Sequence, residues 1–155
     1  MFIDYTFYTT VYGGTGLTSQ EFTKYAQKAC RYISAETMDR VTDTKITKYP
    51  LELQNDIRLC ACEIAEKYKM LDKIEDNILK SASGEKGTTI KSEKSGQASI
   101  EYGSSDAIIN TFKDPKSFKK YIYKIFSEYI YPKEINGVMW NLASKVLPEC
   151  RECML

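Results

Sequence analysis

The sequence predicts a mainly α-helical fold: a small bundle of three to four helices with one long central helix, interrupted by an inserted β-hairpin or loop. Apolar residues recur at helical spacing in several stretches, and the longest of these runs from Leu51 to about Leu79. Residues 81–105, by contrast, are rich in glycine and serine and contain few large apolar side chains. The chain has 155 residues, 43% of them hydrophobic, so we expect a single domain, residues 1–155, with residues 81–105 as its insertion.

A capping box marks the start of the first predicted helix. In Thr18-Ser-Gln-Glu21 the Thr18 hydroxyl can accept a hydrogen bond from a backbone N–H of the first turn, and the Glu21 carboxylate can accept one from the Thr18 N–H. Residues 39–48 are polar and β-branched without helical phase, which predicts a loop. Between the two, an apolar stripe carries the helix to about Met38 or Arg40; it consists of Phe22, Tyr25, Ala26, Ala29 and Ile33.

The long central helix is predicted to begin after Pro50, because proline is tolerated in a first helical turn and restricts the residue before it. At 1.5 Å per residue it would extend roughly 40 Å, enough to traverse the domain. Its apolar face consists of Leu53, Ile57, Cys60, Ala61, Ile64, Tyr68, Leu71 and Ile78. The opposite face is expected to be partly exposed, with Cys62 as an exposed or interface thiol; it consists of Arg58, Cys62, Glu66, Lys69 and Lys73.

Two further helices are predicted towards the end of the chain. The first follows Asp114-Pro115, with an apolar face made of Phe118, Tyr121, Ile122, Ile125, Phe126 and Tyr129. The opposite face carries a candidate DNA-facing basic set, to which Lys113 and Lys119 add: Lys116, Lys120 and Lys124. Aromatic and lysine side chains on one surface can bind single-stranded nucleic acid. Here they lie on opposite faces of the helix, which indicates that the aromatic side chains belong to the core and the lysines are solvated. Glu134 to Leu147 is predicted to form the last helix.

Composition excludes several classes of function. The chain has no histidine, so it lacks the usual Ser-His or Cys-His nucleophilic pair, and we expect neither an enzyme nor a cofactor. The net charge of +1 gives no sign of a protein that coats duplex DNA. No long apolar run or secretory leader is evident, which predicts no membrane span and a cytoplasmic chain.

The five cysteines are expected to be reduced thiols. Cys30 and Cys60 fit helix core faces as small hydrophobes. Cys150-x-x-Cys153 has the spacing of a ligand pair, yet a closed zinc site requires four ligands, so we expect no metal. The role of this terminal segment stays open.

The segment from Lys91 to Tyr102 has the pattern of a short polar hairpin. Gly96 can supply the positive φ of a tight reversal, and the Ser, Ile and Tyr positions around it suit short pleated arms. A two-stranded hairpin is marginally stable on its own in water, so neighbouring molecules are expected to order it. The pattern therefore predicts a projecting loop.

This hairpin, preceded by Tyr12-Gly-Gly, the helix from Thr18 and the long helix after Pro50, resembles the head–tail connector family of tailed bacteriophages. In many of those proteins a Ser-Glu-Lys-x-Gly-x-x-Ser hairpin follows the second helix. The resemblance spans Phe2 to Tyr131. The assembly hairpin that it indicates here comprises Ser92, Glu93, Lys94, Ser95, Gly96 and Ser99.

The resemblance implies a structural subunit of the virion that assembles in the host cytoplasm. Such subunits form a homo-oligomeric ring, commonly of about twelve copies, with one side-to-side interface repeated around it. The ring docks to the portal protein, extends the channel through which packaged DNA passes, and provides a surface for a tail or head-closure protein. Two alternatives remain open: a small nucleic-acid-binding regulator that uses the Lys113 to Lys124 helix face, and a helical adaptor unrelated to phage.

Overall fold

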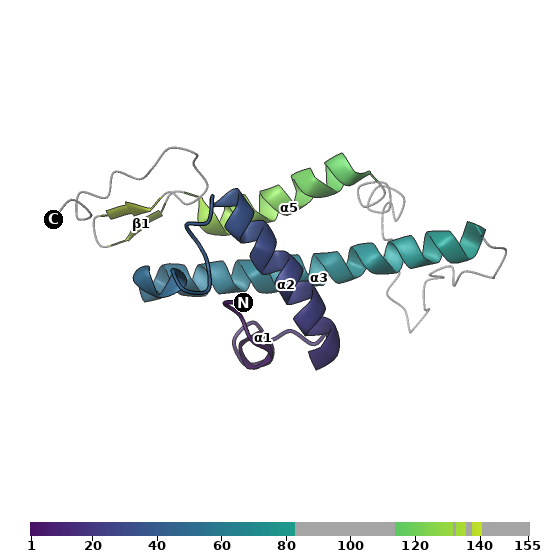
Figure 1. Ribbon diagram of the computed structural model, residues 1–155, viewed down its shortest axis with the longest axis horizontal. Helices are drawn as coiled ribbons and strands as arrows, with labels where there is room; N and C mark the ends of the chain where they lie inside the picture. The colour runs from purple at the N-terminus through teal and green to yellow at the C-terminus, as the bar shows by residue number, and fades with distance from the viewer. Residues whose placement is uncertain (83–113, 132, 136–137, 141–155) are drawn as a thin grey trace, which may run out of the picture.

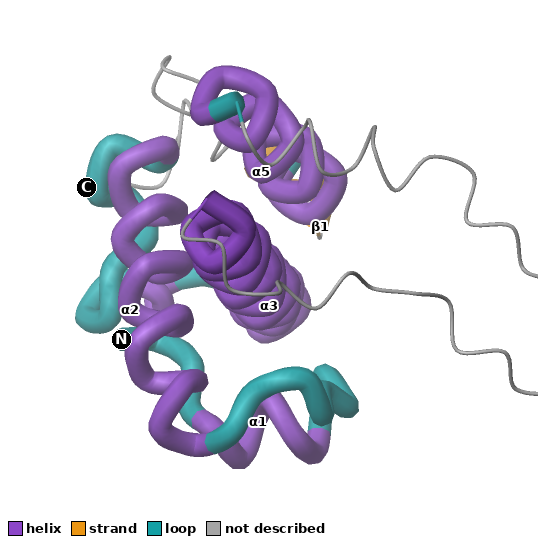
Figure 2. Tube along the Cα trace, turned by 90° about the vertical axis from the view of Figure 1, so that its right-hand side faces the viewer, coloured by secondary structure: helices purple, strands orange, loops and turns teal. Residues whose placement is uncertain are grey.

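The computed structural model describes residues 1–82, 114–131, 133–135 and 138–140, and its fold is mainly α, with about four helices packed together. The central helix α3 crosses α2 on one side, and α5 runs back along it (Figure 1). Seen end-on, α5, α2 and α1 lie on three sides of α3 (Figure 2). The elements in order are α1 (Tyr5–Thr10), α2 (Ser19–Glu36), the 3-10 helix η1 (Ile46–Lys48), α3 (Leu51–Ala82), α5 (Pro115–Ile130), β1 (Lys133–Ile135) and β2 (Val138–Trp140).

Helix α2 begins at the predicted capping box. The Glu21 N–H donates to the Thr18 hydroxyl over 3.4 Å, and the Thr18 N–H donates to the Glu21 carboxylate over 2.9 Å. The helix ends at Glu36, slightly earlier than expected, because the next residues leave the helical conformation. Met38 and Asp39 have φ of 51° and 58°, in the left-handed region.

Helix α3 runs from Leu51 to Ala82, and its predicted apolar face is confirmed for the described side chains. The fully covered members of this face are Leu53, Ile57, Cys60, Ala61 and Ile64, while Tyr68 and Leu71 are half-buried against the core. The side chain of Ile78 lies outside the described ones. Helices α2 and α5 cover this face, as a long amphipathic helix requires.

The second face of α3 is covered at Cys62 and Lys69 and exposed at Lys73, so it is partly exposed as predicted, but the expectation for Cys62 is wrong. Cys62 and Ala65 are 0% exposed, whereas the sequence predicts an exposed or interface thiol at Cys62. Residues 1–17, which we call the strap, account for the difference: they fold as α1 and a loop over this face (Figure 2). The apolar residues that the strap buries are Phe2, Ile3, Tyr8 and Leu17. A helical-wheel argument finds two faces but does not show that a short segment elsewhere in the chain covers the more polar one.

Helix α1 is not predicted from the sequence. It has only six residues, too few for a recognisable apolar period, and it depends on tertiary contacts for stability. Its local signal is Asp4, whose side chain accepts a hydrogen bond from the Phe7 N–H at 2.8 Å and so caps the helix.

Helix α5 begins at Pro115, as predicted, with Asp114 as its N-cap. Its buried residues are Phe118, Ile122, Ile125, Phe126 and Ile130.

The prediction of a helix from Glu134 to Leu147 is wrong over its described part. There β1 pairs with β2 in an antiparallel arrangement, with Ile135 opposite Val138. The Asn136-Gly137 dipeptide that joins the strands is a strong hairpin signal, and it outweighs the helical spacing of the apolar residues. Residues 141–147 lie outside the described part of the chain.

Two glycines shape the loop that leads from α1 to α2. Gly13 has a φ of 73°, which side chains rarely allow. Gly14 packs against the ring of the fully buried Tyr8, so an added Cβ would overlap with that ring. The loop can therefore close over Tyr8 only with glycine at position 14.

We expect Gly14→Ala to destabilise the protein by about 1–3 kcal/mol, the usual cost of overpacking a core. The measurement is the midpoint of urea unfolding. Gly16→Ala is the matched control, because its added Cβ would lie 3.4 Å from the end of the Glu66 side chain and should cost little. Equal losses for the two variants would contradict the close contact with Tyr8.

Candidate functional site

The predicted assembly hairpin, Ser92, Glu93, Lys94, Ser95, Gly96 and Ser99, lies outside the described residues. The helices that flank it are described: α3 ends at Ala82 and α5 begins at Pro115. Because α5 runs back along α3, both attachment points lie towards the same end of the molecule (Figure 1). Residues 83–113 therefore leave and rejoin one end of the helical bundle.

The predicted basic set lies on the outward side of α5. Lys116, Lys120 and Lys124, which we call the lysine face, are all exposed, and Lys119 is exposed beside them. Lys124 approaches Glu128 at 3.9 Å on the same helix, an exposed pair worth little in stability. Lys113 lies outside the described residues. The lysines are exposed and Phe118 and Phe126 are buried, as expected, but Tyr123 lies exposed on the lysine side of α5.

A shallow depression runs along the lysine face. It is lined by Ser117, Lys120, Tyr121, Tyr123, Lys124 and Ser127. Tyr123 is 43% exposed, so an aromatic ring is available next to two ammonium groups. This combination can contact phosphate groups and stack on a base.

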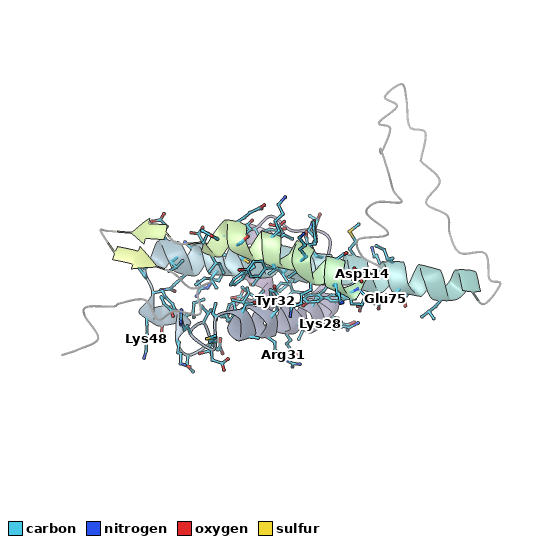
Figure 3. The ribbon with its side chains drawn as sticks, turned by 90° about the horizontal axis from the view of Figure 1, so that it is seen from above. Lys28, Arg31, Tyr32, Lys48, Glu75 and Asp114 are labelled. Carbon is cyan, nitrogen blue, oxygen red and sulfur yellow. The ribbon has the colours of Figure 1, made fainter. Side chains whose placement is uncertain are left out.

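An apolar groove of about 300 Å³ lies where α2, α3 and α5 meet. It is lined by Tyr32, Tyr68, Leu71, Phe118, Lys119 and Ile122. Figure 3 shows Tyr32 in the layer between α2 and α5. The Tyr32 and Phe126 rings are nearly perpendicular, with their centroids 6.2 Å apart. The Tyr32 hydroxyl is buried without a hydrogen-bond partner among the described residues, which is unusual for a buried polar group.

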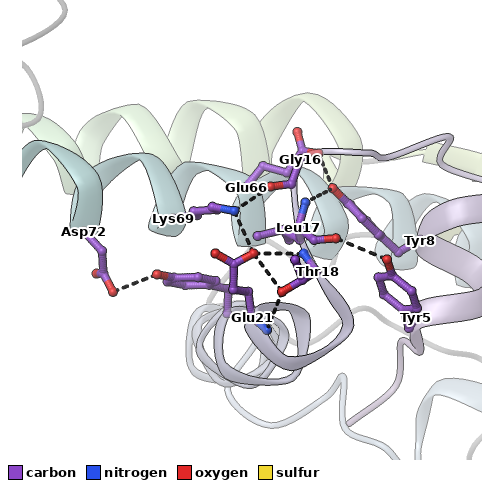
Figure 4. Close-up of polar contacts among 10 residues, drawn as sticks. Tyr5, Tyr8, Gly16, Leu17, Thr18, Glu21, Glu66, Lys69 and Asp72 are labelled. Atoms are coloured by element: carbon purple, nitrogen blue, oxygen red, sulfur yellow. Dashed lines mark hydrogen bonds and ion pairs between the residues drawn. The ribbon is translucent and has the colours of Figure 1, made fainter. Parts of the chain in front are cut away.

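The strap is joined to α3 by a network of tyrosines and carboxylates that the sequence does not indicate (Figure 4). The Tyr8 hydroxyl donates to one oxygen of Glu66 at 2.7 Å, and the Tyr12 hydroxyl donates to the other at 3.2 Å. The Leu17 N–H in turn donates to the Tyr8 hydroxyl. On the α5 side, Tyr129 donates to Glu63 at 3.0 Å. Glu63 and Glu66, one turn apart on α3, thus bind different elements.

These hydroxyls are suited to hydrogen bonding rather than to proton transfer at neutral pH. Burial, the hydrogen bond to Glu66 and the Glu66 charge raise the pKa of Tyr8 above its ordinary value. Burial and the same carboxylate charge raise the pKa of Tyr12. Burial and the hydrogen bond to Glu63 raise the pKa of Tyr129 to about 12. The tyrosines therefore stay neutral donors, which favours a structural role for the network.

Lys69 connects the strap, α2 and α3. Its ammonium donates to the Gly16 carbonyl at 2.8 Å and to the Glu21 carboxylate at 2.7 Å, and its side chain is only 16% exposed. The expectation that Lys69 lies on an exposed face is therefore wrong. Glu21 caps α2 and holds Lys69 at the same time, as Figure 4 shows. The capping box is visible in the sequence; its link to Lys69 is not.

The described residues offer no cluster of three or more histidine, cysteine or acidic side chains that could hold a metal ion. Cys30, Cys60 and Cys62 are free and buried, and Cys150 and Cys153 lie outside the described residues. None of the described helices has a stretch long and apolar enough to cross a membrane.

No protein-family model, curated protein or solved structure matches this chain. The resemblance to phage connectors rests on residues of the sequence alone and stays a prediction.

The acid side of the stability curve should depend on Glu21. The hydrogen bond from Lys69, followed by those from the Thr18 N–H and hydroxyl, lowers the pKa of Glu21 from 4.5 to about 2. Glu21 binds a proton less tightly in the folded state than in the unfolded state. The ionised Glu21 therefore stabilises the fold above pH 4.5, and this stabilisation is lost as the pH falls towards 2. We expect the midpoint of urea unfolding to fall over this range.

The lowered pKa values of two other carboxyls act in the same direction. Partial burial would raise the pKa of Asp72, but hydrogen bonds from Lys24 and Tyr25 outweigh it and lower that pKa. The Ser117 hydroxyl and N–H lower the pKa of Asp114.

Glu21→Gln and Lys69→Met should each remove the part of the pH dependence of stability that the Glu21–Lys69 pair provides. A wild-type pH profile in both variants would contradict this assignment.

Proposed function

We propose that this protein is a structural subunit of a phage head–tail connector, without catalytic activity. It would assemble with copies of itself into a ring in the virion, dock to the portal protein, and present a surface to a tail or head-closure protein. Packaged DNA would pass through the ring. The observation that carries this proposal is the Ser92-Glu-Lys-Ser-Gly96-x-x-Ser99 sequence placed between two helices, which resembles the connector hairpin.

The arrangement of the helices supports this proposal. The segment with the hairpin motif joins α3 to α5, which pack against each other and bury apolar residues such as Phe118 and Ile64. A motif attached at both ends to packed helices can be offered to a neighbouring subunit without disturbing the core. Loops held by a rigid scaffold are common sites of interaction.

The charge distribution also suits a channel component. The chain carries 22 Lys and Arg against 21 Asp and Glu, so its net charge is close to zero. A subunit that made many phosphate contacts would bind DNA tightly, which opposes sliding.

Replacing Glu93 to Gln97 by a short Gly-Ser linker should leave the melting temperature almost unchanged, because loop length affects stability weakly. In a phage whose only copy of the gene carries the change, assembly should stop at filled heads that lose DNA or do not join tails. Electron microscopy of the lysate and plaque counts measure this. Normal infectivity would exclude the hairpin from connector function.

A second candidate, a nucleic-acid-binding regulator, is favoured by one observation: the lysine face is exposed and borders a depression with tyrosines. If this function is correct, DNA affinity should fall steeply with salt. Lys→Gln changes at 116, 120 and 124 should each reduce the log–log salt slope by about one if that lysine neutralises a phosphate. Lys73→Gln, an exposed position on α3, is the control. Absence of DNA binding at low salt would exclude this function.

A further inference from the structure

Positive charge is concentrated on α5. This helix contains four lysines and one acidic residue, Glu128, although the whole chain carries 22 Lys and Arg against 21 Asp and Glu. All four lysines are exposed, and among the described ion pairs only Lys124 takes part, at 3.9 Å from Glu128. The other three ammonium groups are therefore available to a ligand that carries several negative charges.

The lysine face forms a row along the helix. Lys116, Lys120 and Lys124 follow one another at intervals of four residues. This spacing places them on one side of α5, about 6 Å apart along the helix axis and about 12 Å from first to last. A single small anion cannot reach all three, so the row favours a linear polyanion.

Exposed tyrosines lie beside this row. Tyr123 follows Lys120 by three residues, is 43% exposed, and lines the same depression as Lys120 and Lys124. Tyr131, the C-cap residue of α5, follows Lys124 by seven residues and is 64% exposed. The outer side of α5 thus offers aromatic rings as well as ammonium groups.

The core supports the ring of Tyr123. The ring leans against that of Phe126, with centroids 6.0 Å apart and planes at 36°, and Phe126 is 0% exposed. A ring that is held by the core and still open to solvent is a platform on which a nucleic-acid base can stack. In a duplex the neighbouring base pairs cover both faces of each base, so stacking on this ring requires an unpaired base.

We propose that the outer side of α5 binds a single strand of nucleic acid, with phosphates along the lysine face and an unpaired base stacked on Tyr123. Glu128 opposes a phosphate at Lys124, so Lys116 and Lys120 contribute most of the charge interaction. This inference rests on the second candidate function, nucleic-acid binding by the lysine face, and names the ligand of that face. The stacking ring, rather than charge alone, makes the site selective for single strands.

A comparison of strand types tests the ligand class in the full-length chain. Oligothymidine and oligouridine of about twelve nucleotides, within the usual range of single-strand site sizes, are compared with a DNA duplex of equal length by fluorescence anisotropy at low salt. At least one single strand should bind about tenfold more tightly than the duplex. Equal binding of the duplex would overturn this inference but leave DNA binding by the lysine face standing. No binding of any of the three would overturn both.

Substitution of Tyr123 separates stacking from charge. Tyr123→Leu keeps an apolar side chain against Phe126 but removes the ring, so it should weaken single-strand binding about tenfold and leave duplex binding unchanged. Tyr123→Phe keeps the ring and should bind like the wild type. Lys120→Gln should weaken binding of both ligands, whereas Lys73→Gln, an exposed change of equal charge on α3, should not. Wild-type affinity of Tyr123→Leu for single strands would overturn the inference.

Photo-crosslinking provides a measurement on the unmodified chain. An oligothymidine with 5-iodouracil in place of one base links on irradiation to an aromatic side chain that stacks on that base. Mass spectrometry of the peptides then locates the linked residue. Tyr123 is expected to be the main site, and the absence of a link to Tyr123 would equally overturn the inference.

Discussion

The structure depends on covering α3 on two sides. Its apolar face packs against α2 and α5, while the opposite face brings Glu66 and Lys69 into partly buried positions. Charged groups removed from water without partners cost several kcal/mol. The strap provides two tyrosine hydroxyls as partners for Glu66. It also provides a carbonyl for Lys69, whose second partner is the Glu21 carboxylate of α2. The position of the strap and the charges on α3 therefore require each other.

This arrangement makes several residues serve more than one element. Glu21 closes the first turn of α2 and also binds Lys69, so the start of α2 is fixed against α3. Tyr8 fills the core with its ring and uses its hydroxyl for both Glu66 and the Leu17 N–H. Such shared contacts link the strap, α2 and α3 through a few side chains.

Among the described contacts, Lys116, Lys120 and Lys124 take no part in this network. The lysine face is on the outward side of α5, and the proposed assembly motif belongs to the segment between α3 and α5. The bundle thus acts as a frame with a stable interior. Changes at the lysine face can alter interactions without removing core contacts.

Elements with strong local signals can be predicted from the amino-acid sequence. The capping box at Thr18, Pro50 before α3 and Asp114-Pro115 before α5 mark helix starts through local hydrogen bonding and fixed φ, and the apolar periods identify the faces that α2, α3 and α5 bury. The cover over the second face of α3 emerges only in three dimensions, because it depends on pairs 48 or more residues apart, such as Tyr8 with Glu66 and Lys69 with Glu21. Periodicity describes one helix at a time and carries no information about which distant segment lies on it. For this reason the sequence predicts an exposed or interface thiol at Cys62, although the folded chain buries it.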